Sequence, residues 1–387
     1  MAAATALLAG GCLPSPEHHC DESAAMACGA SGACVDGYCA FADSACPSGL
    51  RYGDGAGARS GACAGGSGPV DAAVDAPADH GFGLGLDGPA LVTAPIERSF
   101  NTCAPVVAGP AGRVVDYDRG AMVVATLPGV GDFEPGRLVI VWQTSSAANG
   151  AITVGDQAPS TTALVGRWQV SRVVAAERGR LTLADDLAFA PAAGAQVCRV
   201  PELTTVDIRS AMVDGVLQPI DVRPAPWNGA AGGLVAFYAS DTVTISGAGT
   251  SISASSHGFR GGAGTTTAGA TADCQELSGP TANGGGAHRG EGPFSDYYAA
   301  GDGAPEAFGR GNAASGGGGG DCLDAGGGGG AGGVAGGEGG YQATAAHTGS
   351  GLGGAPIVAD PRTQLLMGGG GGGGEGNDGQ AGAGGPG

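Results

Sequence analysis

The sequence predicts a mainly β fold in three parts. These are a small disulfide-rich N-terminal module, an antiparallel β-domain, and a glycine-rich extension that is β-helix-like or polyproline-II-like and partly disordered. Three observations predict it. Six cysteines lie between residues 20 and 63, short β-type runs follow, and 82 of the 387 residues are glycine, many of them in the unbroken runs 316–320, 326–330 and 368–374. Little helix is expected, because no long stretch has an apolar period of 3.6 residues.

The N-terminus resembles a bacterial lipoprotein signal over residues 1–12. A short apolar run, Ala2–Ala9, precedes Gly10, Gly11 and Cys12. In such signals small residues stand before a cysteine that is acylated and becomes the first residue of the mature protein. Cys12 is therefore the predicted lipid anchor, and the alternative is an ordinary alanine-rich N-terminus with a stray thiol.

Residues 13–64 form the predicted cysteine-rich module. A span this short cannot fold on apolar burial alone, so six cysteines within it indicate up to three disulfides and an oxidising compartment. A zinc cluster is the alternative, but no CxxC pair occurs, and no metal site is expected. Six cysteines permit 15 pairings, so the connectivity stays open. The predicted disulfide cysteines of this module are Cys20, Cys28, Cys34, Cys39, Cys46 and Cys63.

Residues 65–90 read as an acidic linker rich in Ala, Pro and Gly. Asp71, Asp75 and Asp79 recur there with almost no large apolar residue. The order of ligands does not fit an EF-hand, which needs alternate ligands, an inner Gly and a terminal Glu. The stretch is therefore expected to be solvated.

Residues 91–226 are predicted to be an antiparallel β-domain, a sandwich or a barrel. Short runs of β-branched and apolar residues alternate with Gly and Pro turn signals, which is typical of such folds. We expect one disulfide in this part, Cys103–Cys198, and a second, Cys274–Cys322, further along. The expected strands are 123–126, 137–142, 168–174, 180–183 and 196–200.

Residues 227–387 are predicted to be a glycine-rich β region and tail. Strands are expected at 234–239, 242–246 and 251–254, where small and β-branched residues suit a parallel β-helix or a flat glycine-rich sheet. The later glycine runs either pack as polyproline-II helices or are disordered. The apolar islands 355–358 and 365–367 favour partial order.

No catalytic site, metal site or cofactor is expected. The stretch 316–324 fits one nonapeptide of a calcium-binding β-roll, which needs consecutive copies. His257 is interpreted as a turn residue, with a surface groove as the alternative. Adjacent Asp185 and Asp186 are expected to cap a turn, not to flank a glycosidic bond. Trp142, Trp168 and Trp227 have sugar stacking as an alternative to core packing.

Several stretches come in an order that resembles one group of proteins. They are GDFEPGRLVIVWQ (131–143), GRWQVSRV (166–173), LTLADDL (181–187), GAQVCRVPELTTVDI (194–208), WNGAAGGLVAFYASDTVTISG (227–247) and SHGFRGG (256–262). The group comprises the glycine-rich surface lipoproteins of myxobacteria that are named for adventurous gliding motility. Cys34–Cys46, followed by Pro47-Ser48-Gly49, resembles the small cysteine-rich heads of surface lipoproteins from these bacteria. The resemblance implies an exported surface protein and supplies no catalytic residue.

The expected function is a non-enzymatic lipoprotein of the outer membrane or cell surface with an adhesive or structural role, linked by the resemblance to gliding motility. The expected partners are a membrane, through the lipid anchor, and polysaccharide or other surface proteins. Nucleic acid is not an expected partner, because the formal charge of −19 offers no cationic surface to phosphates. The alternatives are a polysaccharide-degrading enzyme with a β-helix-like domain and a passive surface spacer.

Overall fold

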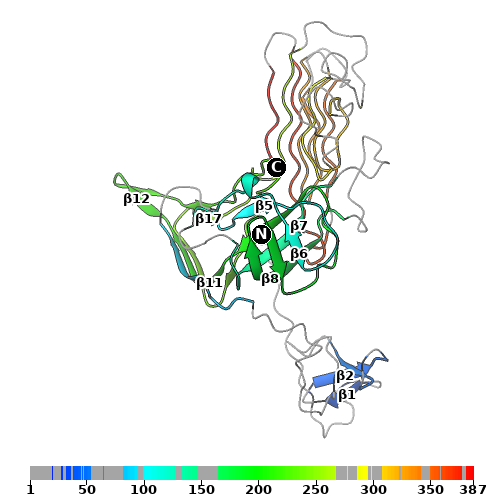
Figure 1. Ribbon diagram of the computed structural model, residues 1–387. Coiled ribbons are helices and arrows are strands. Elements are labelled where there is room, and N and C mark those ends of the chain that lie inside the picture. The colour runs from blue at the N-terminus through cyan, green and yellow to red at the C-terminus, as the bar shows by residue number, and fades with distance from the viewer. Residues whose placement is uncertain are drawn as a thin grey trace, which may run out of the picture. The chain divides into compact units, whose positions relative to one another are not determined.

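The computed structural model is mainly β, with no α-helix among the residues that it describes. It divides into two compact units, Met1–Asp79 and His80–Gly387 (Figure 1). The described residues are 20, 28, 32–35, 38–44, 46, 48–53, 64, 82–93, 99–127, 133–146, 164–266, 277, 286–294, 298, 307–321, 324–340, 349–357, 359–376 and 381–387.

The first unit is a small antiparallel sheet that is cross-linked by disulfides. Strand β2 (Tyr38–Ala42) lies between β1 (Gly32–Val35) and β3 (Leu50–Tyr52). Among its described residues, the buried apolar cluster is small and consists of Ala40, Tyr52 and Ala64. A core of this size contributes little burial energy, so the cross-links have to hold the sheet together.

The second unit contains a six-stranded antiparallel sheet in the order β5-β10-β7-β8-β9-β6. Leu138–Gln143, the sequence LVIVWQ, forms a central strand in which every residue is buried. Apolar side chains therefore point to both faces of the sheet, and a separate core packs on each face. The strands are β5 (Cys103–Pro105), β6 (Val114–Asp116), β7 (Leu138–Gln143), β8 (Trp168–Glu177), β9 (Arg180–Leu183) and β10 (Ala195–Val200).

A second sheet of this unit is parallel, which differs from the antiparallel arrangement expected for 91–226. Strand β11 (Glu202–Arg209) pairs in parallel with β4 (Gly88–Val92) and with β15 (Tyr238–Ala239) and β16 (Val243–Ser246). Strand β14 (Asp221–Val222) likewise pairs in parallel with β17 (Ser251–Ile252). Parallel strands are joined by long connections, and local sequence patterns do not show which distant strands such connections bring together.

Between the parallel strands, a two-stranded hairpin extends away from the sheets. It consists of β12 (Ala211–Val213) and β13 (Val216–Gln218), and Figure 1 shows its tip projecting beyond the neighbouring strands. Asp214 and Gly215 form the turn with positive φ angles of 48° and 80°. Two left-handed residues match the right-handed twist of a hairpin, and Asp-Gly is a favoured pair for them. A short 3-10 turn, η2 (Arg119–Ala121), lies between β6 and β7 in the sequence.

The glycine-rich part packs into what we call the glycine bundle, the described residues of 258–265, 286–291, 307–321, 324–340, 349–355, 368–376 and 381–387. Its extended segments run side by side (Figure 1). In 370–375, backbone amides that are three residues apart donate to the same neighbouring segment. The amides of 370 and 373 donate to 288–291, those of 371 and 374 to 382–385, and those of 372 and 375 to 325–328. The N···O distances are 2.8 or 2.9 Å.

Only glycine fits at the centre of the glycine bundle. A Cβ atom on Gly372 would lie 1.9 Å from the carbonyl oxygen of Gly318, and one on Gly317 would lie 2.1 Å from that of Gly328. Both distances are far inside van der Waals contact, so neighbouring backbones would have to move apart. At the edge the restriction disappears, since a Cβ on Gly337 would meet nothing within 4 Å.

Further details differ from the sequence-based predictions. The expected boundary at 226/227 does not separate compact units, because Trp227, Phe259 and Met367 pack into one core with the six-stranded sheet. The end of the expected linker, 82–90, is folded, and β4 begins in it. Residues 123–126 form no strand, because only Val123 makes a bridge, to Cys103.

Candidate functional site

An apolar pocket of about 300 Å³ opens on the second unit. Two of its walls follow from strand register: Ile140 of β7 faces Val170 of β8, and Trp168 lies two residues before Val170 on the same face. Residues 234–238, which lead into β15, and two residues of a later segment, Pro361 and Leu365, supply most of the remaining lining. The lining residues are Ile140, Trp168, Val170, Val200, Leu234, Val235, Ala236, Phe237, Tyr238, Pro361 and Leu365.

Aromatic stacking and backbone hydrogen bonds position these walls. Phe237 stacks on Phe100 with ring centres 4.9 Å apart, and Tyr238 stacks on Phe82 at 6.0 Å. The indole Nε1 of Trp168 donates to the carbonyl of Pro361 at 2.9 Å. Burial, together with the negative charge of Glu202, raises the pKa of the Tyr238 hydroxyl, which therefore stays protonated at neutral pH. The lining offers an apolar surface with one neutral hydroxyl.

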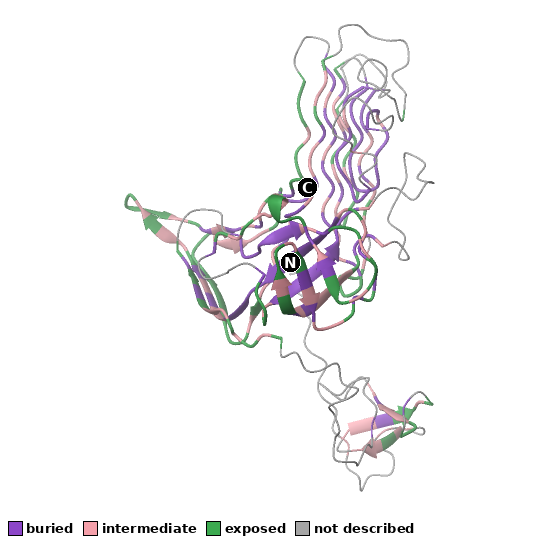
Figure 2. Cartoon of the chain, viewed as in Figure 1, coloured by how far each residue is buried: buried purple, intermediate pink, exposed green. Residues whose placement is uncertain are grey.

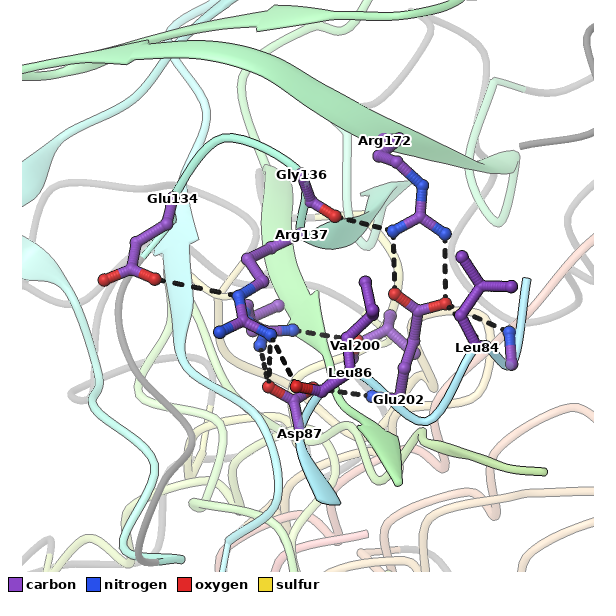
Figure 3. A network of polar contacts seen from close by, with 11 residues as sticks. Leu84, Leu86, Asp87, Glu134, Gly136, Arg137, Arg172, Val200 and Glu202 are labelled. Atoms are coloured by element: carbon purple, nitrogen blue, oxygen red, sulfur yellow. Dashed lines mark hydrogen bonds and ion pairs between the residues drawn. The ribbon is translucent and has the colours of Figure 1, made fainter. Parts of the chain in front are cut away.

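A buried carboxylate lies next to this pocket, because Glu202 pairs with Tyr238 in the parallel sheet. The Glu202 side chain is 0% exposed, and both of its oxygens accept from the guanidinium of Arg172, at 2.8 and 3.0 Å. The amides of Gly83 and Leu84 also donate to Oε1, at 3.0 and 3.3 Å (Figure 3). The carboxylate therefore ties the segment before β4 to strands β8 and β11.

A second buried carboxylate completes the network. The Asp87 side chain is 1% exposed, and its Oδ1 accepts from Arg199 at 2.6 Å and from Arg137 at 2.8 Å. Its Oδ2 accepts from the amide of Glu202 at 2.8 Å, which links the two carboxylates (Figure 3). Burial lowers the pKa of the Arg199 guanidinium, and the adjacent Asp87 carboxylate opposes that effect.

This network is built to hold structure. Every carboxylate oxygen of Asp87 and Glu202 accepts at least one charged or amide hydrogen, which is the condition for burying such charges. A general acid or base needs a proton that it exchanges with a substrate, and saturated, buried carboxylates are poorly placed for that. The arrangement therefore acts as a buried clamp between the pocket and strand β4.

The disulfides among the described residues are Cys20–Cys34, Cys28–Cys39 and Cys103–Cys198. The last pair is the one expected from the sequence, and it joins β5 to β10. Cys46 is also disulfide-bonded. Sulfur atoms of Cys20, Cys28 and Cys39 lie within 4.8 Å of one another, the geometry that a zinc cluster would need, but they belong to two disulfides.

Some predicted positions lie outside the described residues. They are the proposed lipidation site and three of the disulfide cysteines: Cys12, Cys63, Cys274 and Cys322. Of the single β-roll nonapeptide, Gly316–Gly320 and Asp321 are buried in the glycine bundle, where the glycines bond to neighbouring backbones.

The tryptophans pack mainly into the core. Trp142 and Trp227 are almost completely buried, and the Nε1 of Trp142 donates to the carbonyl of Leu365 at 2.7 Å. Trp168 is half-buried in the pocket wall. His257 is also buried, with Nδ1 2.8 Å from the carbonyl oxygen of Ser255, so it lines no surface groove.

The adjacent aspartates do not act as a pair. Asp185 accepts from the hydroxyl of Ser171 at 2.9 Å and, through its own amide, donates back to that oxygen. Asp186 forms an exposed ion pair with Arg113. The two carboxylates therefore serve different neighbours, as expected of residues at a strand end.

Sequence reasoning missed the buried clamp and the β12–β13 hairpin. Asp87 stands among glycines and prolines, a context that predicts solvent exposure, so no local signal marks it. The hairpin did have a signal, because Asp214-Gly215 separates two apolar pairs, Met212-Val213 and Val216-Leu217. An Asp-Gly pair between apolar runs indicates a two-residue hairpin.

None of the described segments is a long apolar helix of the kind that crosses a membrane. No protein-family model matches the chain, and comparisons with curated proteins and with solved structures found no match for it.

Proposed function

We propose that the chain is a non-enzymatic, lipid-anchored protein of the bacterial cell surface with an adhesive or structural role. The observation that carries the proposal is the glycine bundle. Its glycine runs are joined by backbone hydrogen bonds in three directions. The buried carboxylates beside them have structural partners: Glu291 pairs with Arg260 at 2.8 Å, and Glu375 accepts from the amide of Asp324 at 3.1 Å. Such a body supports and spaces other surfaces, and it offers few groups for catalysis.

We propose further that the glycine bundle consists of polyproline-II-like helices. The three-residue repeat of its hydrogen bonds supports this, because a polyproline-II helix has three residues per turn and a β-strand has a period of two. The close approach of neighbouring backbones at Gly372 and Gly317 supports it as well. For residues 202–252, the parallel pairing of β11 with β16 and of β14 with β17 supports a short β-helix-like stack.

The surface location rests on the N-terminal sequence and on the disulfides. Disulfides persist in oxidising compartments, which fits an exported protein. The segment before Cys12 resembles a lipoprotein signal, and the stretches from 131 to 262 resemble the gliding-motility group of surface lipoproteins. In this proposal Cys12 carries the lipid, and polysaccharide or other surface proteins are the partners.

Lipidation is tested by expressing the full chain in a Gram-negative host fed with labelled palmitate. We expect the label and the protein in the outer-membrane fraction, and loss of both from that fraction for Cys12→Ser. As a matched control, Cys46→Ser removes another cysteine without removing the acylated one. Equal labelling of the Cys12→Ser protein would contradict the anchor.

Adhesion is tested on an array of bacterial and plant polysaccharides, with retention and release of reducing ends scored on the same spots. Retention without release is the expected result. Release would favour the polysaccharide-degrading enzyme and overturn the non-enzymatic proposal. If the chain is neither retained nor active on any spot, an adhesive role is contradicted and the protein acts as a spacer.

A further inference from the structure

The β12–β13 hairpin carries an unusual amount of exposed apolar surface. Met212 and Leu217 are cross-strand partners on one face, 65% and 55% exposed, and Val216 at the turn is 56% exposed. Figure 2 shows the tip of the hairpin in the colour of exposed residues. A two-stranded hairpin alone is marginally stable in water, and adjacent apolar side chains on a projection are typical of interaction sites.

The apolar pocket is the complementary feature on the same unit. Its lining of Trp168, Val170, Phe237 and other apolar residues offers a dry surface to aliphatic groups. The volume of about 300 Å³ is at the small end for ligand pockets, which suits a pair of aliphatic side chains better than a large ligand.

Charge at the two places is also complementary. Asp214, at the tip, is the only charged residue of the hairpin, Ala211–Gln218. Next to Pro361, which lines the pocket, the Arg362 side chain is 88% exposed and pairs through Nε and Nη2 with Asp360, at 3.1 Å from Nη2. Because an exposed ion pair of this kind is weak, a hairpin that enters the pocket could place the Asp214 carboxylate against the same guanidinium.

We infer that the hairpin of one copy inserts Met212 and Leu217 into the apolar pocket of a second copy, so that the protein assembles head to tail. Because the projecting element and the pocket are different surfaces, the contact is heterologous and continues from copy to copy until it forms a ring or a filament. The inference deepens the proposed structural role and rests on it. Its test in solution is nevertheless independent of lipid anchoring and of polysaccharide retention.

The first experiment measures the mass of the full chain by sedimentation velocity over a range of concentrations. We expect a mass that rises with concentration. Association should strengthen with added salt, because copies with a formal charge of −19 repel one another. Leu217→Ser should weaken association about 10- to 100-fold, as expected for the loss of one buried leucine at a contact. A protein that stays monomeric at its highest soluble concentration overturns the inference.

Leu91→Ser is the matched control, because Leu91 is 58% exposed on β4 and Leu217 is 55% exposed. It removes the same apolar surface at a different place and should leave association unchanged. Equal losses for both variants would indicate nonspecific hydrophobic contact and contradict the inference.

A mixing experiment tests the head-to-tail geometry. Ala236→Phe fills the pocket but keeps the hairpin, whereas Leu217→Ser keeps the pocket. Each variant alone should associate far more weakly than the unaltered chain, and at the same total concentration an equal mixture should form mainly a one-to-one dimer and nothing larger. Association that persists undiminished in Ala236→Phe alone would place the contact elsewhere.

Photo-crosslinking avoids the risk that Ala236→Phe disturbs folding. A benzophenone amino acid at position 217, in a mixture of isotopically heavy and light chains, should give heavy-to-light crosslinks to the pocket residues Trp168 and Phe237. Crosslinks from hairpin to hairpin would show a symmetric contact and overturn the inference. So would binding of the chain to phospholipid vesicles that requires Leu217 while the chain remains monomeric.

Discussion

In the six-stranded sheet, β7 buries six side chains, whereas in the glycine bundle the segment 316–320 is equally buried and has no side chains. The sheet keeps its backbone groups within one layer and fills the space on both faces with apolar atoms. The glycine runs of the bundle have no side chains to fill such space, and their backbones approach until a single Cβ would collide. The sheet is thus stabilised by apolar burial, and the bundle by closely spaced hydrogen bonds.

The difference teaches that burial has opposite consequences for substitution in the two regions. A sheet position tolerates a modest change of shape, because side chains can rearrange around it. A central position in the bundle tolerates no added atom, because its neighbours are backbone and cannot rotate away. The cost of ordering glycine is also high, so the bundle depends on nearly all of its hydrogen bonds forming together.

The largest effect is expected for Gly372→Ala. The new Cβ would lie 1.9 Å from the Gly318 oxygen, so neighbouring segments must separate and lose hydrogen bonds. We expect a loss of more than about 4 kcal/mol in the stability of the bundle, measured as amide hydrogen exchange of 370–375 and its neighbours. Gly337→Ala is the matched control, since nothing lies within 4 Å there. Unchanged exchange for Gly372→Ala would contradict the close packing.

Asp87→Ala should be the most damaging substitution tested in the sheet region. It leaves the buried Arg199 guanidinium without its carboxylate, and breaking a buried ion pair in this way costs about 3–5 kcal/mol. The midpoint of thermal unfolding reports the loss. Asp116→Ala removes an exposed partner of Arg180 and should cost far less. Similar losses for both variants would show that the clamp is not stabilising.

Val141→Ala measures ordinary core packing in β7. The side chain is 0% exposed, and deleting its two methyl groups should cost about 2 kcal/mol through lost burial and the cavity left behind. The denaturant midpoint of the second unit is the readout. The contrast with Gly372→Ala is the point of the experiment. If deleting atoms from the sheet harmed stability more than adding one atom to the bundle, the comparison between the regions would fail.

The smallest effect is an acid-dependent loss at the β14–β17 pair. Burial of the Asp221 carboxyl opposes ionisation, but hydrogen bonds from Ser251 and Arg223 outweigh it and lower the pKa below 3.8. A lowered pKa stabilises the fold above the unfolded pKa, and this stability is lost as the pH falls through the folded value. We expect a loss below about 1 kcal/mol under pH 4, seen in thermal unfolding. Asp221→Asn should remove that pH dependence.

The sequence predicted most strands of the six-stranded sheet, because continuous or alternating β-branched runs such as 137–142 and 196–200 have few other ways to bury their side chains. It also led to the Cys103–Cys198 pair, since these were the only two cysteines in that region. The parallel pairing of β11 with β4 was not predictable, because the partners are separated by more than a hundred residues and share no local pattern.

The clamp and the pairing of segments within the bundle were beyond sequence reasoning for another reason. Asp87 lies in a glycine-rich stretch that reads as solvated, and only the folded chain brings Arg199 and Arg137 to it. In the glycine runs every residue is the same, so no residue marks which segment it will join. The apolar pocket likewise depends on Pro361 and Leu365 meeting β8 from a distant part of the chain.

The three-residue repeat in the hydrogen bonds of 370–375 restricts how the glycine runs can change in length. Inserting one glycine would direct every following amide towards the wrong neighbour, whereas inserting three would restore each amide to its former partner segment. Runs of this kind should therefore grow or shrink by multiples of three within a buried segment. Insertions and deletions of other sizes should occur at the turns between segments, where the three-residue repeat of hydrogen-bond partners does not have to be maintained.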